Sequence, residues 1–403
     1  MSYSSSLFVF FVGLTVMGQV LLPVRFRLLW PTLMSFLWFF SWDPYLPVFL
    51  FGLISLNHFL TKKKALVLLV LTNLSALIFL RMTSFLPSLG SSFYLLILTG
   101  IGLESGKVSR TFSETFFLGS FFPVMMAGPV LRDLESPVVS KERIFDGILI
   151  FAMGFLKYQF LVVPMGFMNF LDNSVLFQVF LITMKIYLSL SSFSDMGRGV
   201  ARMLGFDVVA AFHPVFFSRN PSDFWNRWNH TVAAWFRDFL IFPSLLRWGR
   251  KIPGFVIVMA GFLTLGLWHG LELHWVFFGL FNGLMIILWN KFQRAGRLLA
   301  MVTVFGNGFI QLRGSHLPVN PDWLTGLFQK NWWREGGMSF LAAICLLLIC
   351  EVLQERFRDN DFFLRTPLSL KKFFAILSVI IWMWAADIRV PLVQDFLPMY
   401  FTL

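Results

Sequence analysis

The chain has 403 residues, of which 57% are hydrophobic and only 13% are charged, and its formal net charge is +12. A soluble domain carries a charged fraction of about 25%, so the composition excludes an ordinary soluble protein and predicts a membrane protein. The positive charge does not indicate nucleic-acid binding. The basic residues fall in short loops between apolar runs, where the positive-inside rule explains them.

Apolar segments recur along the whole chain. At the length needed to cross about 30 Å of hydrocarbon they predict about eleven to twelve transmembrane helices. The expected spans lie near residues 7–23, 28–41, 45–60, 65–80, 92–105, 146–163, 175–191, 253–268, 272–290, 299–312, 338–354 and 373–390. The first has no basic start and no small-residue cleavage site, so we expect it to be retained. If the basic loops are cytosolic, both termini lie outside.

The predicted fold class is therefore an all-α polytopic membrane protein, with residues 1–403 forming a single integral membrane domain. We divide it into N-terminal helices (1–110), a core that carries the candidate site (111–290) and C-terminal helices (291–403).

Two stretches interrupt the pattern of spans. Residues 111–135 are apolar but broken by Gly119, Pro123, Gly128 and Pro129, and such backbone is tolerated at membrane depth only inside protein or around a water-filled cavity. Residues 192–250 mix polar, aromatic and basic side chains. We expect re-entrant or interfacial helices in both places.

The segment from Asn220 to Thr231 begins the first candidate site. Ser222 is expected to cap a helix, and Asp223 and Arg227 are four residues apart, so they are expected to pair. On the helix that follows, one face is polar or small and comprises Asn226, Asn229, His230, Ala233 and Arg237, whereas the other carries Phe224, Trp225, Trp228, Trp235 and Phe239. This helix either lies at the interface with its polar face in water or lines a polar cavity. Asn and His favour the cavity, because Lys and Glu suit a solvating face better.

The second candidate site is the Trp268-His269-Gly270 turn between two apolar runs. An ionisable side chain there is costly unless it faces a cavity or a partner. His269 is either a hydrogen-bonded structural residue or a general base, since a reference pKa of about 6.5 suits proton transfer near neutral pH. Gly266 and Gly270 would allow another backbone or a substrate to approach closely. His274 lies too far round a helix to share a metal ion with His269, so no metal site is expected.

Two further groups of residues are read as structural. Asp195 is expected at a helix end, paired with Arg198 or Arg202. Cys345 and Cys350 are five residues apart on different faces of one apolar run, which indicates neither a disulfide nor a zinc pair.

These motifs resemble a known family. Residues 193–243 are similar to the signature region of the membrane-bound O-acyltransferase family, and most similar to its bacterial branch of alginate O-acetylation proteins and teichoic acid D-alanyl transferases. The matching pieces are Phe193-Ser194-Asp195-Met196, Leu204-Gly205-Phe206, Ser218-Arg219, Ser222-Asp223-Phe224-Trp225, Arg227-Trp228, Trp235-Phe236-Arg237-Asp238, Ala127-Gly128-Pro129-Val130 and Trp268-His269-Gly270.

The resemblance implies a helical bundle with a central funnel that reaches the histidine, and His269 as the catalytic residue. The family's second polar position is His in the alginate-type branch and is Asn229 here, which we expect to polarise the acyl carbonyl or to orient the substrate. The remaining candidates for substrate or donor binding are Trp225, Arg227, Trp228, His230, Arg237, Asp195 and Trp268.

The implied reaction is O-acylation, with acetyl-CoA or another cytosolic acyl thioester as co-substrate and no bound cofactor. The expected acceptor is a hydroxyl of an exported polysaccharide or an extracytoplasmic acyltransferase partner, and the expected location is the inner (cytoplasmic) membrane. Lipid or protein O-acylation by the same machinery is one alternative. A transporter or flippase of a lipid-linked or glycan substrate is another, because such proteins share broken segments and polar groups at the membrane midplane.

Overall fold

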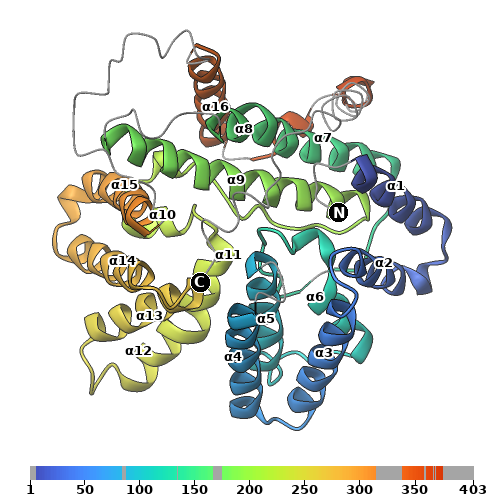
Figure 1. Cartoon of the computed structure of the whole chain (residues 1–403), viewed down its shortest axis with the longest axis horizontal. Helices are drawn as coiled ribbons and strands as arrows, with labels where there is room; N and C mark the ends of the chain where they lie inside the picture. Colours follow the sequence, from blue (N-terminus) through green and yellow to red (C-terminus); the bar gives the residue numbers. More distant parts are fainter. Residues whose placement is uncertain are drawn as a thin grey trace.

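The computed structural model describes residues 6–83, 88–133, 135–166, 175–314, 338–357, 360–365, 367 and 369–374. All regular secondary structure in these residues is helical (Figure 1). The predicted all-α polytopic membrane fold is confirmed.

The helices follow one another with short connections. In chain order they are α1 (Ser6–Leu21), α2 (Leu29–Phe40), α3 (Leu46–Lys62), α4 (Leu66–Thr83), α5 (Ser88–Leu103), α6 (Phe112–Ser120), α7 (Lys141–Lys157), α8 (Val163–Gly166), α9 (Val175–Met203), α10 (Pro221–Trp225), α11 (His230–Phe236), α12 (Phe242–Trp248), α13 (Gly254–His269), α14 (Leu273–Lys291), α15 (Gly296–Gly314) and α16 (Met338–Phe357). π-helical turns at Tyr158–Val162 and Arg237–Ile241 join α7 to α8 and α11 to α12.

Each span predicted before residue 355 coincides with one of these helices. By length and composition, four helical stretches in the described residues can cross a membrane, namely Lys141–Val162, Val175–Met203, Leu273–Lys291 and Gln293–Gly314. Other apolar helices in the described residues, such as α3 and α13, are shorter and have 10–17 residues. The predicted span at 373–390 lies almost wholly outside the described residues.

Helix α9 is the central element of the fold. Figure 1 shows it running between α7, α8 and α16 on one side and the two groups α2–α6 and α10–α15 on the other. Its 29 residues correspond to roughly 43 Å at 1.5 Å per residue, which exceeds the hydrocarbon thickness. The sequence predicted a span that ends near residue 191, with Asp195 at the helix end. This was wrong, because the helix continues to Met203 and its last turns are buried against α7.

Backbone contact between α7 and α9 depends on small residues. A Cβ atom on Gly199 would lie 2.4 Å from the backbone nitrogen of Phe151 and 2.6 Å from the carbonyl oxygen of Gly147. Only glycine permits this approach, and small residues are what allow membrane helices to pack closely.

Amide side chains join neighbouring helices within each of the two groups α2–α6 and α10–α15. Asn57 and Asn73 exchange two hydrogen bonds of 2.9 Å between α3 and α4, and Asn73 also donates to Thr99 of α5 at 2.9 Å. Asn282 and Asn307 pair in the same manner between α14 and α15, at 2.7 and 3.2 Å. Such pairs satisfy polar groups that hydrocarbon would leave bare.

The broken segment predicted at residues 111–135 is confirmed. Thr111 and Glu114 form a capping box at the start of α6, which ends at Ser120. A short 3₁₀ turn follows and the backbone then continues without regular structure, yet its residues to Leu131 are buried. Protein therefore surrounds this non-helical backbone, as its depth requires.

Candidate functional site

His269 is the last residue of α13, at the turn of the hairpin that α13 forms with α14. Its imidazole stacks on Trp275 with ring centroids 4.6 Å apart and planes inclined by 14°. Phe278 meets it edge-on at 5.4 Å, and the Trp268 ring lies 4.6 Å away. The imidazole is half-buried, so aromatic rings fix its plane while part of it remains accessible.

The tight hairpin explains the glycine at position 266. A Cβ atom there would lie 2.2 Å from the carbonyl oxygen of Trp275. The predicted close approach is therefore confirmed, and the group that approaches is the backbone of α14. This contact sets Trp275 against His269.

The Asn220–Thr231 segment differs from the predicted helix in two respects. The helix cap is Asn220, whose side chain accepts a hydrogen bond from the backbone N–H of Asp223 at 2.8 Å. The prediction of Ser222 as the cap was wrong because Pro221 occupies the first helical position, where its fixed φ is favoured. The predicted pair is confirmed, with Arg227 Nε and Asp223 Oδ1 3.1 Å apart.

The second difference is at Asn229. The sequence predicted one continuous helix with a polar stripe, but α10 ends at Trp225 and α11 begins only at His230. Asn229 has φ 36° and ψ 52°, a left-handed conformation. Asparagine is among the few non-glycine residues that adopt it readily. The predicted stripe is therefore interrupted: Asn226 and Asn229 lie in the break between the helices, whereas His230 and Ala233 lie in α11.

Aromatic contacts join this segment to the hairpin. Trp225 contacts Phe278 at 6.1 Å between centroids, and Phe278 in turn contacts His269. On the other side of the break, Phe236 contacts Trp268 at 6.0 Å. Of the predicted site residues, Trp225 and Trp268 are thus brought close to His269, and Asn229 lies between the two contact points along the chain.

Asn229 is also tied to the broken segment. Its side-chain oxygen is 3.5 Å from the hydroxyl of Thr231, which accepts a hydrogen bond from the backbone N–H of Val130 at 3.0 Å. The side-chain amide nitrogen of Asn229 makes no hydrogen bond within the described residues. It is therefore available as a donor.

Arg227 and Trp228 point instead toward α16 and α9, and His230 points toward the loop that carries Ala211 and His213. Arg227 forms an ion pair with Glu355 at 2.6 Å and donates to the carbonyl of Pro214 at 3.0 Å. Trp228 stacks on Tyr187, 5.9 Å between centroids. His230 contacts the carbonyl of Ala211 and lies with its ring 5.2 Å from that of His213.

Burial favours the neutral forms of the two histidines. Burial lowers the pKa of His213, and the nearby Arg227 and Arg198 act in the same direction against a hydrogen bond with Asn360. Burial also lowers the pKa of His230, and His213 adds to the effect. This pair is consequently suited to a structural role at neutral pH.

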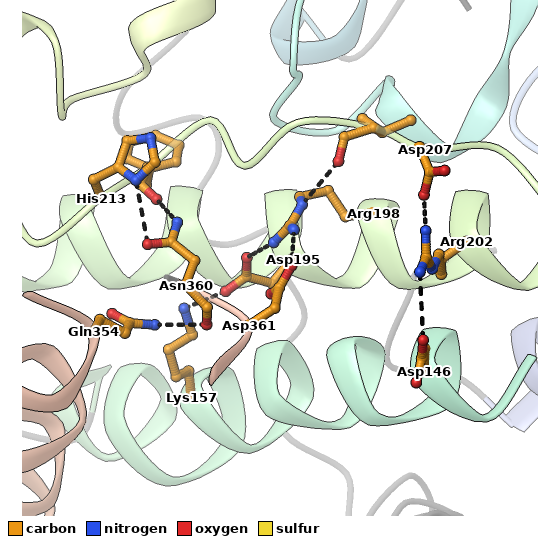
Figure 2. Close-up of polar contacts among 12 residues, drawn as sticks. Asp146, Lys157, Asp195, Arg198, Arg202, Asp207, His213, Gln354, Asn360 and Asp361 are labelled. Carbon is orange, nitrogen blue, oxygen red and sulfur yellow. Dashed lines mark hydrogen bonds and ion pairs between the residues drawn. The ribbon is translucent and has the colours of Figure 1, made fainter. Parts of the chain in front are cut away.

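Asp195 and Arg237 both form ion pairs. Figure 2 shows Asp195 between Lys157 of α7 and Arg198 of α9, with Arg198 continuing to Asp361. Arg202 contacts Asp146 and Asp207 instead. Of the two predicted partners of Asp195, Arg198 is therefore the one that pairs with it. Arg237 pairs with Asp238 at 2.8 Å on the π-helical turn and is 43% exposed.

Several residues of this polar network were not singled out in the sequence, among them Lys157, Glu351, Glu355, Asn360 and Asp361. The sequence did contain a signal for Glu351 and Glu355, which lie in or next to the predicted span at 338–354. Acidic side chains in such places are functional candidates by default. The contact of Lys157 with Asp195 joins residues 38 positions apart, and those of Glu351, Glu355 and Asp361 with Tyr187, Arg227 and Arg198 join residues more than 120 positions apart. No local pattern reports such pairs.

Fold and site together define a class, namely an all-α multi-span membrane protein with a histidine-bearing helical hairpin packed against a broken, tryptophan-rich segment. No family model matches the chain. It is similar to a Pseudomonas putida protein named "Probable alginate O-acetylase", with 29% identity over 235 residues, or 53% of this chain and 47% of the relative. It is also similar to the teichoic acid D-alanyltransferase of Bacillus subtilis (25% over 201 residues; 43% and 50%) and the peptidoglycan O-acetyltransferase of Helicobacter pylori (23% over 201 residues; 44% and 37%).

The chain matches about half the length of these curated relatives, or less. All three belong to the membrane-bound O-acyltransferases, and the predicted resemblance to this family is therefore confirmed.

Proposed function

We propose that this protein is a membrane-embedded O-acyltransferase that moves a short acyl group, most simply acetyl, from a cytosolic thioester to a hydroxyl. The acceptor is an exported polysaccharide or an extracytoplasmic partner protein, and the location is the cytoplasmic membrane. The observation that carries the proposal is His269, a half-buried imidazole at a hairpin turn between two membrane helices. The names of the relatives support the reaction class.

In this mechanism His269 acts as the general base. It takes the proton from the acceptor hydroxyl as the oxygen attacks the thioester carbonyl carbon. The C–S bond then breaks, and the imidazolium returns the proton to the departing thiolate, so an ester and a thiol are formed without a net change in protons. Stacking on Trp275 fixes the plane in which the imidazole nitrogens lie, and this preorganisation favours proton transfer.

Asn229 is assigned to the developing oxyanion. Its amide nitrogen is a donor that no described residue uses, on a backbone whose left-handed conformation directs the side chain differently from the helices on either side. A preorganised donor of this kind is worth about 2.7–4 kcal/mol in transition-state stabilisation. Trp225 and Trp268 would form apolar walls near the acyl group.

Arg237 is the best placed of the predicted donor-binding residues, since its side chain is 43% exposed. The phosphates of a CoA or phosphopantetheine donor are anionic, and an exposed guanidinium attracts them. Arg227, Trp228, His230 and Asp195 are better explained as residues that position the broken segment.

The proposal is tested by His269→Ala in the cells that naturally produce the chain. We expect acylation of the envelope polysaccharide, measured by mass spectrometry, to fall by about 10²–10⁴-fold, because one general base contributes that much. His274→Ala is the matched control. This residue also contacts Trp275, at 4.7 Å between ring centroids, but from within α14.

Normal acylation with well-expressed His269→Ala protein would refute the catalytic assignment. An acylated lipid or protein in place of the polysaccharide would retain the reaction class and change the acceptor. Transport of a glycan by the purified protein with no acylated product would instead favour the transporter class.

A further inference from the structure

A cavity of about 380 Å³ lies between α7, α9, α16 and the turn at residues 360–363. Its volume falls in the range of small-molecule sites. His269 and Asn229 are not among its lining residues, so the cavity is separate from the proposed catalytic site. Its chemistry can therefore be tested whether or not the proposed function is correct.

One wall of the cavity is apolar and belongs to α7 and the π-helical turn that follows it. The side chains are Ile150, Met153, Leu156, Phe160 and Leu161. They recur at intervals of three and four residues, apart from the adjacent last pair, and thus form a stripe along one helix face. An alkyl chain would fit along this wall.

The remaining lining of the cavity is mainly polar, and its charges are mostly balanced. Lys157 pairs with Asp195, and Arg198 lies 3.3 Å from Asp195 and 2.6 Å from Asp361 (Figure 2). Two basic groups thus balance two carboxylates. Glu351 adds a third carboxylate to the lining.

Glu351 is 1% exposed. Its Oε1 accepts a hydrogen bond from the Tyr187 hydroxyl at 2.5 Å, but its Oε2 is buried without a hydrogen-bond partner in the described part of the chain. It forms no ion pair with the described basic residues either. A buried carboxylate is costly unless a cation and further donors satisfy it.

We infer that this cavity binds an amphiphile with a primary ammonium head group, which pairs with Glu351 while its alkyl chain lies along the apolar face of α7. An ammonium group supplies three donors, and its positive charge favours the ionised form of the Glu351 carboxyl group. Gln354 offers a second acceptor at the same place, since its amide nitrogen donates to the carbonyl of Asn360 at 3.3 Å and its side-chain oxygen remains. The natural source is either an aminophospholipid or a smaller alkylamine.

The test uses the purified full chain in phosphatidylcholine nanodiscs and a dodecylamine that carries a photoreactive diazirine in its chain. After irradiation, we expect mass spectrometry to find the label on α7 between residues 150 and 161. Unlabelled dodecylamine should compete at least about tenfold better than dodecanol, because a charged hydrogen bond is lost with the alcohol. Phosphatidylethanolamine in the nanodisc should reduce labelling if the source is a phospholipid, and should leave it unchanged if the source is a smaller amine.

Glu351→Gln removes the charge but retains an oxygen for the Tyr187 hydroxyl, and it should reduce labelling of α7 about tenfold. Glu142→Gln is the matched control, because Glu142 is 66% exposed and lies outside the cavity. Met153→Trp, which fills the apolar half, should abolish labelling even if Glu351→Gln proves unstable. Equal labelling of wild type and both cavity variants, or equal competition by dodecanol, would overturn the inference.

Discussion

At the scale of single residues, His213 and His230 show how burial sets the charge of the segment that carries Asn229. Their rings lie 5.2 Å apart, and His213 also contacts Asn360 at 3.2 Å. Protonation of both would place two positive charges side by side next to Arg227. Neutral imidazoles avoid this repulsion between the two rings and Arg227.

This predicts a loss of stability in acid. The folded-state pKa of His213 lies below its ordinary value of 6.5, so the unfolded chain binds more protons once the pH falls past that value. The contribution of His213 is complete above about pH 6.5 and is lost as the pH falls toward the folded pKa. The melting temperature in detergent should fall between pH 7.5 and 5.5, and His213→Gln should show a smaller fall. An identical pH dependence in the variant would contradict this account.

At the scale of elements, the α13–α14 hairpin shows how two apolar helices become a site. Neither helix has a pronounced polar face, and apolar character alone would let them pack in many ways. Gly266 selects one arrangement because the carbonyl of Trp275 fills the space where a side chain would be. The stacking of Trp275 on His269 follows from that arrangement.

Replacing Gly266 should therefore separate the helices. We expect Gly266→Leu to lower the free energy of unfolding by about 1–3 kcal/mol, which is typical of overpacking, and to lower acylation because the His269–Trp275 contact is disturbed. Leu267→Val is the matched control, since Leu267 is 40% exposed. Thermal unfolding in detergent measures the first effect and product analysis the second. If Gly266→Leu retained both stability and activity, the hairpin would not be the element that positions His269.

At the scale of the whole molecule, α16 connects the end of the described chain to the candidate site. Glu355 reaches Arg227, Glu351 reaches Tyr187, and Asn360 reaches His213. These contacts lie at the polar lining of the cavity beside Glu351 and around it. Tyr187 in turn stacks on Trp228. Helix α16 and the turn after it thus support the segment that presents Asn229, although they are remote in sequence.

We expect Glu355→Ala to loosen this support. Arg227 retains Asp223 and the Pro214 carbonyl, and the Glu355 side chain is 28% exposed, so the loss should be only about 1 kcal/mol. Hydrogen–deuterium exchange should increase in peptides that cover 211–230 and 345–357, and remain unchanged in α3–α5. The control is again Glu142→Gln. Unchanged exchange in both regions would show that this ion pair does not connect α16 to the segment.

The sequence predicted the helices well because each helix has to satisfy its own backbone hydrogen-bonding groups inside hydrocarbon. That requirement is local to the segment. His269 was found for a similar reason, since an ionisable group at the end of an apolar run is conspicuous. The continuous helix through Asn229 was wrong because a single left-handed residue breaks the periodicity without changing the composition. The cap at Asn220 was missed because Asn220 and Ser222, two positions apart, are both of residue types that cap helices.

The amino-acid sequence by itself therefore determined the membrane class, the positions of the spans, the broken segment at 111–135 and the histidine at the hairpin turn. Only the tertiary structure decided which polar residues meet, because those contacts join helices far apart in the chain. It assigned Arg227, Trp228, His230 and Asp195 to the supporting network with α9 and α16, and it brought Trp225 and Trp268 to His269. It also produced the cavity beside Glu351, since an unbalanced carboxylate can be recognised only when its surroundings are known.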